Sequence, residues 1–174
     1  LDKPKGHIEF KNVSFRYSNA EENVLDNISF DAEPGKTTAF IGATGSGKST
    51  LINLIPRFYD ITDGSIMFDG KDIRDLSQDQ LRGAIGYVPQ KGLLFSGTVE
   101  SNLKFGKEDA TEDDMVSALE TAMAKDFIYE DERELQAPVS QGGTNFSGGQ
   151  RQRLSIARAL TKKAPVYIFD DSFS

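Results

Sequence analysis

The sequence predicts an α/β fold with a mainly helical lobe inserted into its middle, and three observations lead to this expectation. Short apolar and β-branched runs recur through the first half of the chain, in the manner of sheet strands. Between about residues 91 and 145 the pattern changes to helices and loops. A last apolar run, Val166–Phe169, then returns to the character of a core strand.

The N-terminal part is predicted to form a small sheet followed by a core strand. Ile8–Phe10, Val13–Phe15 and Ile28–Phe30 alternate apolar and polar residues, which is the periodicity of half-buried strands. Pro34–Gly35 is typical of a turn. The β-branched run Thr37–Ile41 after it is expected to be a buried strand.

A glycine-rich loop and a short helix are expected next. The loop Gly42–Gly47 leads into a helix over Ser49–Ile55, which Pro56 stops because proline cannot continue the helical hydrogen bonds. Two further strands are then predicted, namely Gly64–Phe68, closed by the turn Asp69–Gly70, and Ile85–Val88, which ends at Pro89.

The inserted lobe contains two predicted helices. Thr111 can cap the first, whose shared apolar face consists of Met115, Ala118, Leu119, Ala122 and Met123. The glycine-rich stretch Gly142–Gly149 opens the second, which carries Leu154, Ala157 and Leu160. The expected organisation is residues 1–90 as β subdomain and first part of the core, 91–149 as helical subdomain, and 150–174 as the return to the core.

Composition excludes several classes of function. No stretch approaches the roughly 18 consecutive apolar residues that span a bilayer. The absence of cysteine from the sequence excludes disulfides and thiolate metal sites. The net charge of −7 argues against a general nucleic-acid binder, which needs a basic face. Any bound anion must therefore be held locally, by backbone amides and one or two placed cations.

The segment from Gly42 to Ser49 satisfies the pattern G-x-x-x-x-G-K-[ST] of a phosphate-binding loop. Its glycines let successive N–H groups converge on phosphate oxygens, and the following helix adds the positive end of its dipole. Lys48 can reach the β- and γ-phosphates, and the Ser49 hydroxyl can ligate Mg²⁺. An ordinary glycine-rich turn is the alternative, but the motif stands between a predicted strand and a predicted helix, as it requires. The candidate nucleotide-binding residues here are Gly42, Ala43, Thr44, Gly45, Ser46, Gly47, Lys48, Ser49 and Thr50.

A second phosphate-binding surface is predicted at the start of the later helix. Ser147–Gly149 is another amide-rich helix start and hence a second anion site. Asp170 ends the buried strand Val166–Phe169, where it can hold Mg²⁺ opposite Ser49. One bound nucleotide does not need two such surfaces. The sequence therefore suggests two domains that face each other, each covering the other's ATP.

These motifs, in their order and spacing, resemble the ATP-binding-cassette family over essentially the whole chain. The resemblance rests on the phosphate loop, on Val88-Pro-Gln90, on Phe146-Ser-Gly-Gly-Gln150 and on Val166-Tyr-Ile-Phe-Asp170. It implies a P-loop NTPase (RecA-like) core with an N-terminal antiparallel β subdomain and an inserted helical lobe, incomplete at its C-terminus. It also implies an ATPase that uses ATP and Mg²⁺.

The resemblance further implies roles for single residues. Tyr17 stacks on adenine, Gln90 contacts Mg²⁺ and the transport domain, and Asp170 ligates Mg²⁺ with Ser49. Catalytic roles fall to Lys48, Gln90 and Asp171. The signature that contacts the γ-phosphate of ATP held by a partner domain consists of Ser147, Gly148, Gly149 and Gln150. Taken alone, Tyr17 is better explained as an aromatic on a half-buried strand, and Gln90 as a surface residue at a strand end.

Within the family, the stretch Leu94-Phe-Ser-Gly-Thr-Val-Glu-Ser-Asn102 resembles exporters rather than importers. The resemblance thus implies the motor of an exporter at the cytoplasmic face of the cell membrane, with a transmembrane domain upstream in the same polypeptide. A second nucleotide-binding domain, on a non-identical chain, is the other expected partner. Nucleic acid is not an expected partner.

Three departures from the family pattern matter. Asp171 stands where the family carries a glutamate as general base, so its carboxylate falls back by about 1.5 Å. A displacement near 1 Å can cost about a hundredfold in rate, so we expect binding to survive and hydrolysis at this site to be poor. Gln141 replaces an acidic residue before the signature. The single histidine, His7, is expected at the surface and cannot replace the switch histidine, which the family places beyond Ser174.

Two rival functions stay open at this point. A non-hydrolysing regulatory subunit would also tolerate the change at Asp171. A soluble cassette ATPase of chromosome maintenance or repair places long heptad coiled coils between phosphate loop and signature. Here 99 positions without sustained heptads separate Lys48 from Ser147, which disfavours that class.

Overall fold

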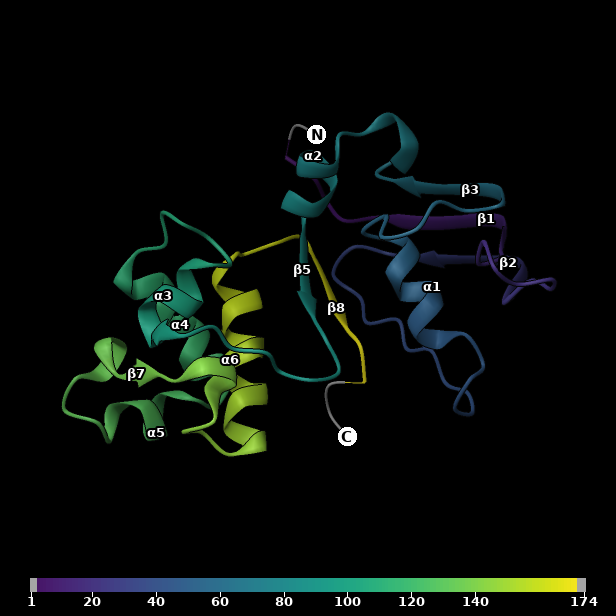
Figure 1. Ribbon diagram of the computed structural model, residues 1–174. Helices are drawn as coiled ribbons and strands as arrows, with labels where there is room; N and C mark the ends of the chain where they lie inside the picture. Colours follow the sequence, from purple (N-terminus) through teal and green to yellow (C-terminus); the bar gives the residue numbers. More distant parts are fainter. Residues whose placement is uncertain (1–2, 172–174) are drawn as a thin grey trace. The chain divides into compact units, whose positions relative to one another are not determined.

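The computed structural model describes residues 3–171, and the chain divides into two compact units between Ile85 and Gly86 (Figure 1). The first unit contains β1 (Ile8–Phe15), β2 (Leu25–Ala32), α1 (Lys48–Leu54), β3 (Asp63–Phe68), β4 (Lys71–Asp72), η1 (Ile73–Asp75) and α2 (Gln78–Gly83). At the boundary lies β5 (Ile85–Val88). The second unit continues with β6 (Gly97–Thr98), α3 (Val99–Lys104), α4 (Glu112–Thr121), α5 (Lys125–Tyr129), η2 (Glu134–Gln136), β7 (Pro138–Val139), η3 (Gln141–Gly143), α6 (Gly148–Thr161) and β8 (Val166–Phe169). The predicted α/β class is confirmed.

The first unit is built on a four-stranded antiparallel sheet in the order β2-β1-β3-β4. The two stretches predicted around Phe10 and Val13 form one strand, β1, with a register shift between them. Asn12 takes up this bulge with a left-handed φ of 50°. Alternate β1 side chains are buried, as their periodicity predicts, and they contribute Ile8, Phe10, Val13 and Phe15 to the core.

The β3–β4 hairpin ties down the segment that precedes β1. Asp69 and Gly70 both have positive φ, 49° and 77°, which is the backbone of the predicted two-residue turn. The Asp69 carboxylate accepts hydrogen bonds from the backbone N–H groups of Lys5 at 2.8 Å, Gly6 at 3.1 Å and His7 at 2.9 Å. This Asp69 clamp satisfies three consecutive amides with one side chain.

The strand predicted at Thr37–Ile41 is wrong. These residues carry no strand assignment, and Ile41 is 97% exposed. Apolar, β-branched composition favours a strand only where a neighbouring strand takes up its N–H and C=O groups, and no described strand pairs with this segment. Phe40 is the exception to the exposure, because its ring packs edge-on against Phe30 with centroids 4.9 Å apart.

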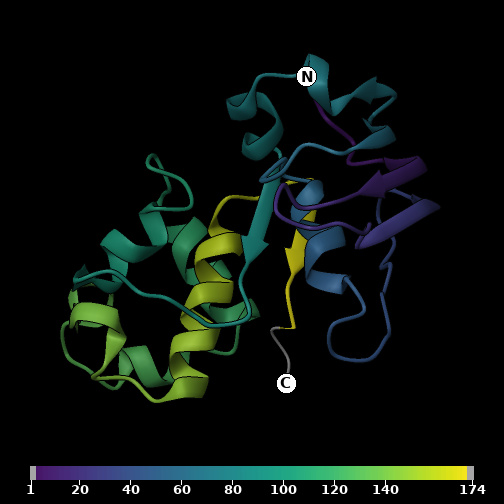
Figure 2. The same ribbon diagram turned by 45° about the vertical axis from the view of Figure 1, so that its right-hand side comes forward.

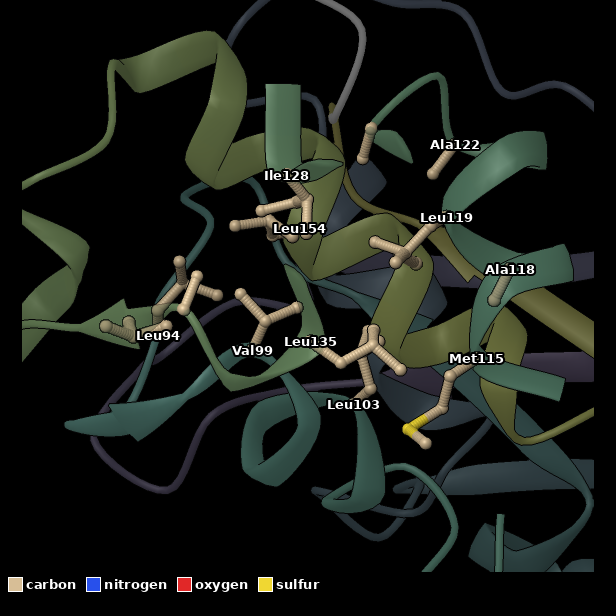
Figure 3. Packing of buried hydrophobic residues seen from close by; sticks show 14 of the residues in the cluster. Leu94, Val99, Leu103, Met115, Ala118, Leu119, Ala122, Ile128, Leu135 and Leu154 are labelled. Carbon is tan, nitrogen blue, oxygen red and sulfur yellow. The ribbon is translucent and has the colours of Figure 1, made fainter. Parts of the chain in front are cut away.

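The second unit packs its helices around one apolar cluster (Figure 3). Met115, Ala118 and Leu119 on α4 face Val99 and Leu103 on α3 and Leu154 on α6, and Ala122 at the end of α4 is also buried. The predicted apolar faces of both helices are thereby confirmed, except at Met123. Met123 is 73% exposed, because α4 ends at Thr121 and Met123 turns the chain with a φ of 56°.

Strands β5 and β8 lie side by side beside these helices, as both Figure 1 and Figure 2 show. They match the predicted strands Ile85–Val88 and Val166–Phe169. Within residues 3–171, every helix is too short or too polar to cross a membrane.

Candidate functional site

The loop before α1 is shaped by glycines with left-handed backbones. Gly45 has a φ of 82° and Gly47, the N-cap of α1, a φ of 90°. A Cβ atom at Gly47 would lie 3.0 Å from Leu25 Cδ2 and 3.3 Å from the carbonyl oxygen of Val24. Both the backbone angle and the neighbouring atoms therefore demand glycine at Gly47.

The start of α1 is not capped by a side chain. Its first turn also contains no acidic residue. The loop and first turn are largely open to solvent, with Gly42 to Ser46 and Ser49 exposed and Gly47 and Lys48 half-buried. A helix start of this kind directs its backbone N–H groups and its positive dipole end towards an anion.

Lys48 points back into the loop that precedes it. Its ammonium donates hydrogen bonds to the carbonyl oxygens of Gly42 at 2.6 Å and Ala43 at 2.9 Å. A phosphate oxygen carries full negative charge and accepts a stronger hydrogen bond than these neutral carbonyls. A change of side-chain rotamer is therefore enough to move the ammonium from the loop carbonyls to a phosphate bound at the loop.

Three aromatic rings gather next to α1. The rings of Tyr17 and Phe15 are nearly perpendicular, with centroids 4.8 Å apart, and Tyr59 lies 5.2 Å from Tyr17 at 89°. The Tyr17 hydroxyl forms a hydrogen bond of 2.9 Å with the hydroxyl of Thr50, which is buried in α1. Tyr17 is thus joined to the helix that follows the phosphate loop. Sequence reasoning missed Tyr59, whose only signal is an exposed aromatic pair, Phe58 and Tyr59, just after α1.

The predicted metal and catalytic carboxylates follow β8. The backbone N–H of Asp170 donates to the carbonyl oxygen of Val88 at 2.9 Å, which joins the ends of β8 and β5. The Tyr87 hydroxyl makes a long hydrogen bond of 3.4 Å to Asp170 Oδ2. Burial, reinforced by the charge of Asp170 and this hydrogen bond, raises the pKa of Tyr87 to about 12. Tyr87 therefore stays a neutral donor to Asp170 at physiological pH.

Gln90 and Asp171 are brought together although 81 positions separate them. The Gln90 side-chain amide donates to Asp171 Oδ2 at 3.4 Å. Asp171 has a left-handed φ of 48°, a backbone region that aspartate tolerates better than most side chains. Two of the three residues to which the resemblance assigns catalytic roles thus lie at hydrogen-bond range.

The start of α6 is closed by its own side chains. Ser147 is the N-cap, and its hydroxyl accepts from the backbone N–H of Gln150 at 3.1 Å. The Gln150 side chain accepts in return from the backbone N–H of Ser147 at 2.9 Å. This capping box leaves Ser147, Gly148 and Gly149 exposed to solvent.

The first turns of the helices differ in charge. Acidic residues occupy the first turns of four of the six α-helices in residues 3–171, namely Asp79 in α2, Glu100 in α3, Glu112, Asp113 and Asp114 in α4, and Asp126 in α5. Only α1 and α6 lack them among these described helices. Carboxylates at a helix start occupy its positive end and repel other anions. The two helix starts predicted to bind phosphate are therefore the two whose charge permits it.

The remaining predicted residues fall as follows. Lys48, Ser49 and Tyr17 belong to the first unit, whereas Gln90, the Ser147–Gln150 segment and both aspartates belong to the second. His7 lies at the surface, where a hydrogen bond to Asp31 raises its pKa, and Gln141 is exposed at the start of η3. The described residues contain no group of three or more His, Asp or Glu arranged to hold a metal ion.

Comparison with known proteins adds a family. The sequence profile of the ABC transporter family matches residues 25–174. An uncharacterised ABC transporter ATP-binding protein of Mycobacterium tuberculosis (strain H37Rv) is 49% identical over 172 residues, which cover 97% of this chain and 29% of that protein. YgaD of Bacillus subtilis, named as a multidrug export ATP-binding/permease protein, is 43% identical over 173 residues, which cover 99% and 30%.

A solved structure is similar over the same range. The structure of a bacterial Atm1-family ABC exporter with ATP bound matches this chain with a TM-score of 0.92 and 36% sequence identity. The match covers 99% of this chain and 30% of that one. The chain thus spans less than a third of the length of the relatives it matches.

Proposed function

Because this chain belongs to the ABC transporter family, we propose that it is the ATP-binding and ATP-hydrolysing motor domain of an exporter. The observation that carries the proposal is the Lys48 ammonium, held inside its glycine-rich loop at the uncapped start of α1. The names of the relatives support export, because they combine ATP-binding with permease or exporter. The organisation into residues 1–90, 91–149 and 150–174 is part of the same proposal.

The phosphate loop binds the triphosphate in this proposal, with Gly42 to Thr50 as donors. The Lys48 ammonium leaves two neutral carbonyls for the charged β- and γ-phosphates, which gives the stronger hydrogen bonds. Tyr17 supplies the aromatic surface for adenine and reaches the same helix through Thr50. The triphosphate is thus held by the loop at the start of α1, and the base by a tyrosine that is hydrogen-bonded to the same helix.

Mg²⁺ fits the donors that the chain offers. The hydroxyl of Ser49, the carboxylate of Asp170 and the amide oxygen of Gln90 are hard oxygen ligands, which Mg²⁺ prefers. With nucleotide phosphates as further ligands, Mg²⁺ needs only one or two protein ligands and no cage of carboxylates. When bound, Mg²⁺ neutralises charge on the transferred phosphoryl group. The Tyr87 hydroxyl positions Asp170 for this role.

We further propose that hydrolysis at this domain's own site is slow. Asp171 is one methylene shorter than the usual glutamate, and its carboxylate is engaged with the Gln90 amide at 3.4 Å. A non-identical partner domain would then supply the faster site, which the Ser147–Gln150 signature of this chain completes. A purely regulatory, non-hydrolysing half is the second candidate, and the same Asp171–Gln90 contact favours it.

The remaining partners follow from the family. The motor domain acts together with a transmembrane domain in the same polypeptide, at the cytoplasmic face of the cell membrane. The permease part in the name of one relative supports this arrangement. A soluble cassette ATPase of chromosome maintenance is disfavoured, because the two named relatives and the similar structure are transporters or exporters.

Binding of Mg·ATP to the intact protein tests the proposal. Lys48→Ala removes the cation beside the phosphates, so the dissociation constant is expected to rise by about tenfold or more. Lys36→Ala is the matched control, because Lys36 is an exposed lysine of the same unit that pairs only with Glu33, at 2.7 Å, among the ion pairs described. Equal ATP affinity for wild type and Lys48→Ala would contradict the assignment.

A further inference from the structure

We infer that Tyr59 is a positioning residue for nucleotide-base recognition, which acts by holding the ring of Tyr17 in place. The inference rests on the proposed function, in which ATP binds beside Tyr17. Tyr59 itself need not touch the nucleotide. Loss of Tyr59 is expected to weaken the binding of the base and to leave the binding of the triphosphate unchanged.

The ring of Tyr17 is fixed on several sides. Phe15 and Tyr59 both stand nearly perpendicular to it, at 83° and 89°, and the distance between Phe15 and Tyr59 is 5.7 Å. Perpendicular aromatic pairs at such distances attract each other through the opposite charges of ring face and ring edge. The three rings thus contact one another in a closed set, which we call the Tyr17 bracket.

The far end of Tyr17 is fixed as well. Its hydroxyl is held by Thr50, which is 8% exposed and belongs to α1. Phe15 is 3% exposed and immobilised within β1. Of the two rings that pack against Tyr17, Phe15 belongs to β1 and Tyr59 comes from a loop, so this loop decides whether the bracket is complete.

The loop that carries Tyr59 is firmly held. Arg57 donates to the Asp60 carboxylate at 2.6 Å, which closes the loop on either side of Tyr59. Arg82 donates to the carbonyl oxygens of Pro56 and Arg57, both at 3.1 Å. A ring on so constrained a backbone costs little entropy when it orders its neighbour. The position of Tyr59 against Tyr17 is therefore built into the loop.

Phe58, the neighbour of Tyr59, is an aromatic residue of the same loop that does not contact Tyr17 in the described ring pairs. It is 47% exposed and Tyr59 is 45% exposed, so neither ring is needed to fill the core. The Phe58 ring packs under the Arg82 guanidinium, 5.3 Å from its centroid. Phe58 and Tyr59 are thus neighbours of similar size and exposure, of which only Tyr59 belongs to the Tyr17 bracket.

The test compares two ligands on the intact protein: ATP, and inorganic tripolyphosphate, which lacks the base. Tyr59→Leu is expected to raise the dissociation constant for ATP about three- to tenfold and to leave that for tripolyphosphate unchanged. Tyr59→Phe keeps the ring and should bind ATP like wild type, as should the control Phe58→Leu. In a Tyr17→Leu background, Tyr59→Leu should have no further effect, because it acts through Tyr17.

Several outcomes would overturn the inference. An equal loss for ATP and tripolyphosphate would mean that Tyr59 supports the phosphate loop structurally. Additive effects of Tyr17→Leu and Tyr59→Leu would mean that Tyr59 acts on its own. Tyr59→Met, which has a flexible side chain without a ring, replaces Tyr59→Leu if that variant does not fold. If wild type binds ATP and no Tyr59 variant changes this, only the inference fails; if wild type binds no ATP, the proposed function fails as well.

Discussion

The helices α1 and α6 both begin after a glycine-rich stretch, yet their first turns are satisfied in opposite ways. No side chain caps α1, and Lys48 lies against the loop before it. At α6, Ser147 and Gln150 already satisfy one another's backbone N–H groups. The first start is open to a ligand that supplies acceptors itself, whereas a ligand at the second must add to an existing cap.

Helix α4 provides the structural reference for this pair. It has the same kind of capping box as α6, formed by Thr111 and Asp114. Its first turn carries three acidic residues, and that of α6 carries none. A capping box alone therefore stabilises a helix, and the lack of acidic residues is what distinguishes a start that can also receive phosphate.

The largest expected effect comes from obstructing the start of α6. Ser147→Arg puts a long side chain over the exposed amides, so the steady-state ATPase rate of the assembled transporter should fall by about tenfold or more. Ser77→Arg is the matched control, because Ser77 caps α2 with the same box, closed by Gln80. It should change the ATPase rate little. Asp171→Asn should also matter far less than Ser147→Arg, if this domain's own site is slow as proposed.

The opposite order of the two effects would contradict the proposal that this domain has a slow site of its own and completes a faster site on a non-identical partner. If Asp171→Asn removes nearly all turnover while Ser147→Arg is tolerated, Asp171 is the catalytic base of an ordinary site. The starts of α1 and α6 would then differ in their capping only, and not in serving a slow site and a fast site of a two-domain pair.

A smaller effect is expected from closing the start of α1. Gly47→Ala forces a side chain to a φ of 90° and places its Cβ 3.0 Å from Leu25. Gly35→Ala has similar strain, with a φ of 72°, but open space around its Cβ. Gly35→Ala should lose about 1 kcal/mol of unfolding free energy in urea titrations, and Gly47→Ala should lose more because of the added crowding. Only Gly47→Ala should also lose ATP affinity, by about tenfold; equal ATP binding by the two variants would contradict the role of the α1 start.

The smallest effect concerns α4 and depends on pH. Hydrogen bonds from Lys163 and Lys107 hold the pKa of Asp114 well below its usual range. A depressed carboxyl pKa in the folded state adds stability that is present above the pKa of the unfolded chain, near 3.9, and is lost as pH falls below it. Asp114→Asn should therefore unfold at lower urea concentration than wild type at pH 7, and this gap should narrow towards pH 3.

Asp113→Asn controls for charge in the same first turn, because Asp113 is exposed. Its unfolding midpoint should stay close to that of wild type at both pH values. A gap between Asp114→Asn and wild type that is the same at pH 7 and pH 3 would mean that α4 is stabilised by packing alone.

The sequence predicted what depends on local pattern and missed what depends on distant partners. Helix α1, the hairpin turn at Asp69 and the capping by Thr111 follow from short-range rules, and the structure confirms them. Thr37–Ile41 has the composition of a strand, but composition does not state which strand pairs with it. Helical periodicity placed Met123 in the core, since periodicity cannot tell where a helix ends.

The same distinction between local pattern and distant partners applies to the candidate site. The phosphate loop and the signature are contiguous motifs and could be found by their spacing. The contact between Gln90 and Asp171 was not predicted, because the family resemblance gave each residue a separate role and the two are 81 residues apart in the sequence. Tyr59 had only a weak signal, since an exposed aromatic after a helix is common and its partners, Phe15 at the end of β1 and Tyr17 just after it, are distant in sequence.

The Asp69 clamp determines how force enters the first unit. Three consecutive amides, of Lys5, Gly6 and His7, hang on one carboxylate at the tip of the β3–β4 hairpin. A pull on the chain before Lys5 is therefore resisted first at this turn, which adjoins the start of β1. The three hydrogen bonds share the load and must break together before β1 can be peeled from its neighbours. Displacement of the preceding segment is thus transmitted to β3 and β4 through the turn that joins them, as well as to β1.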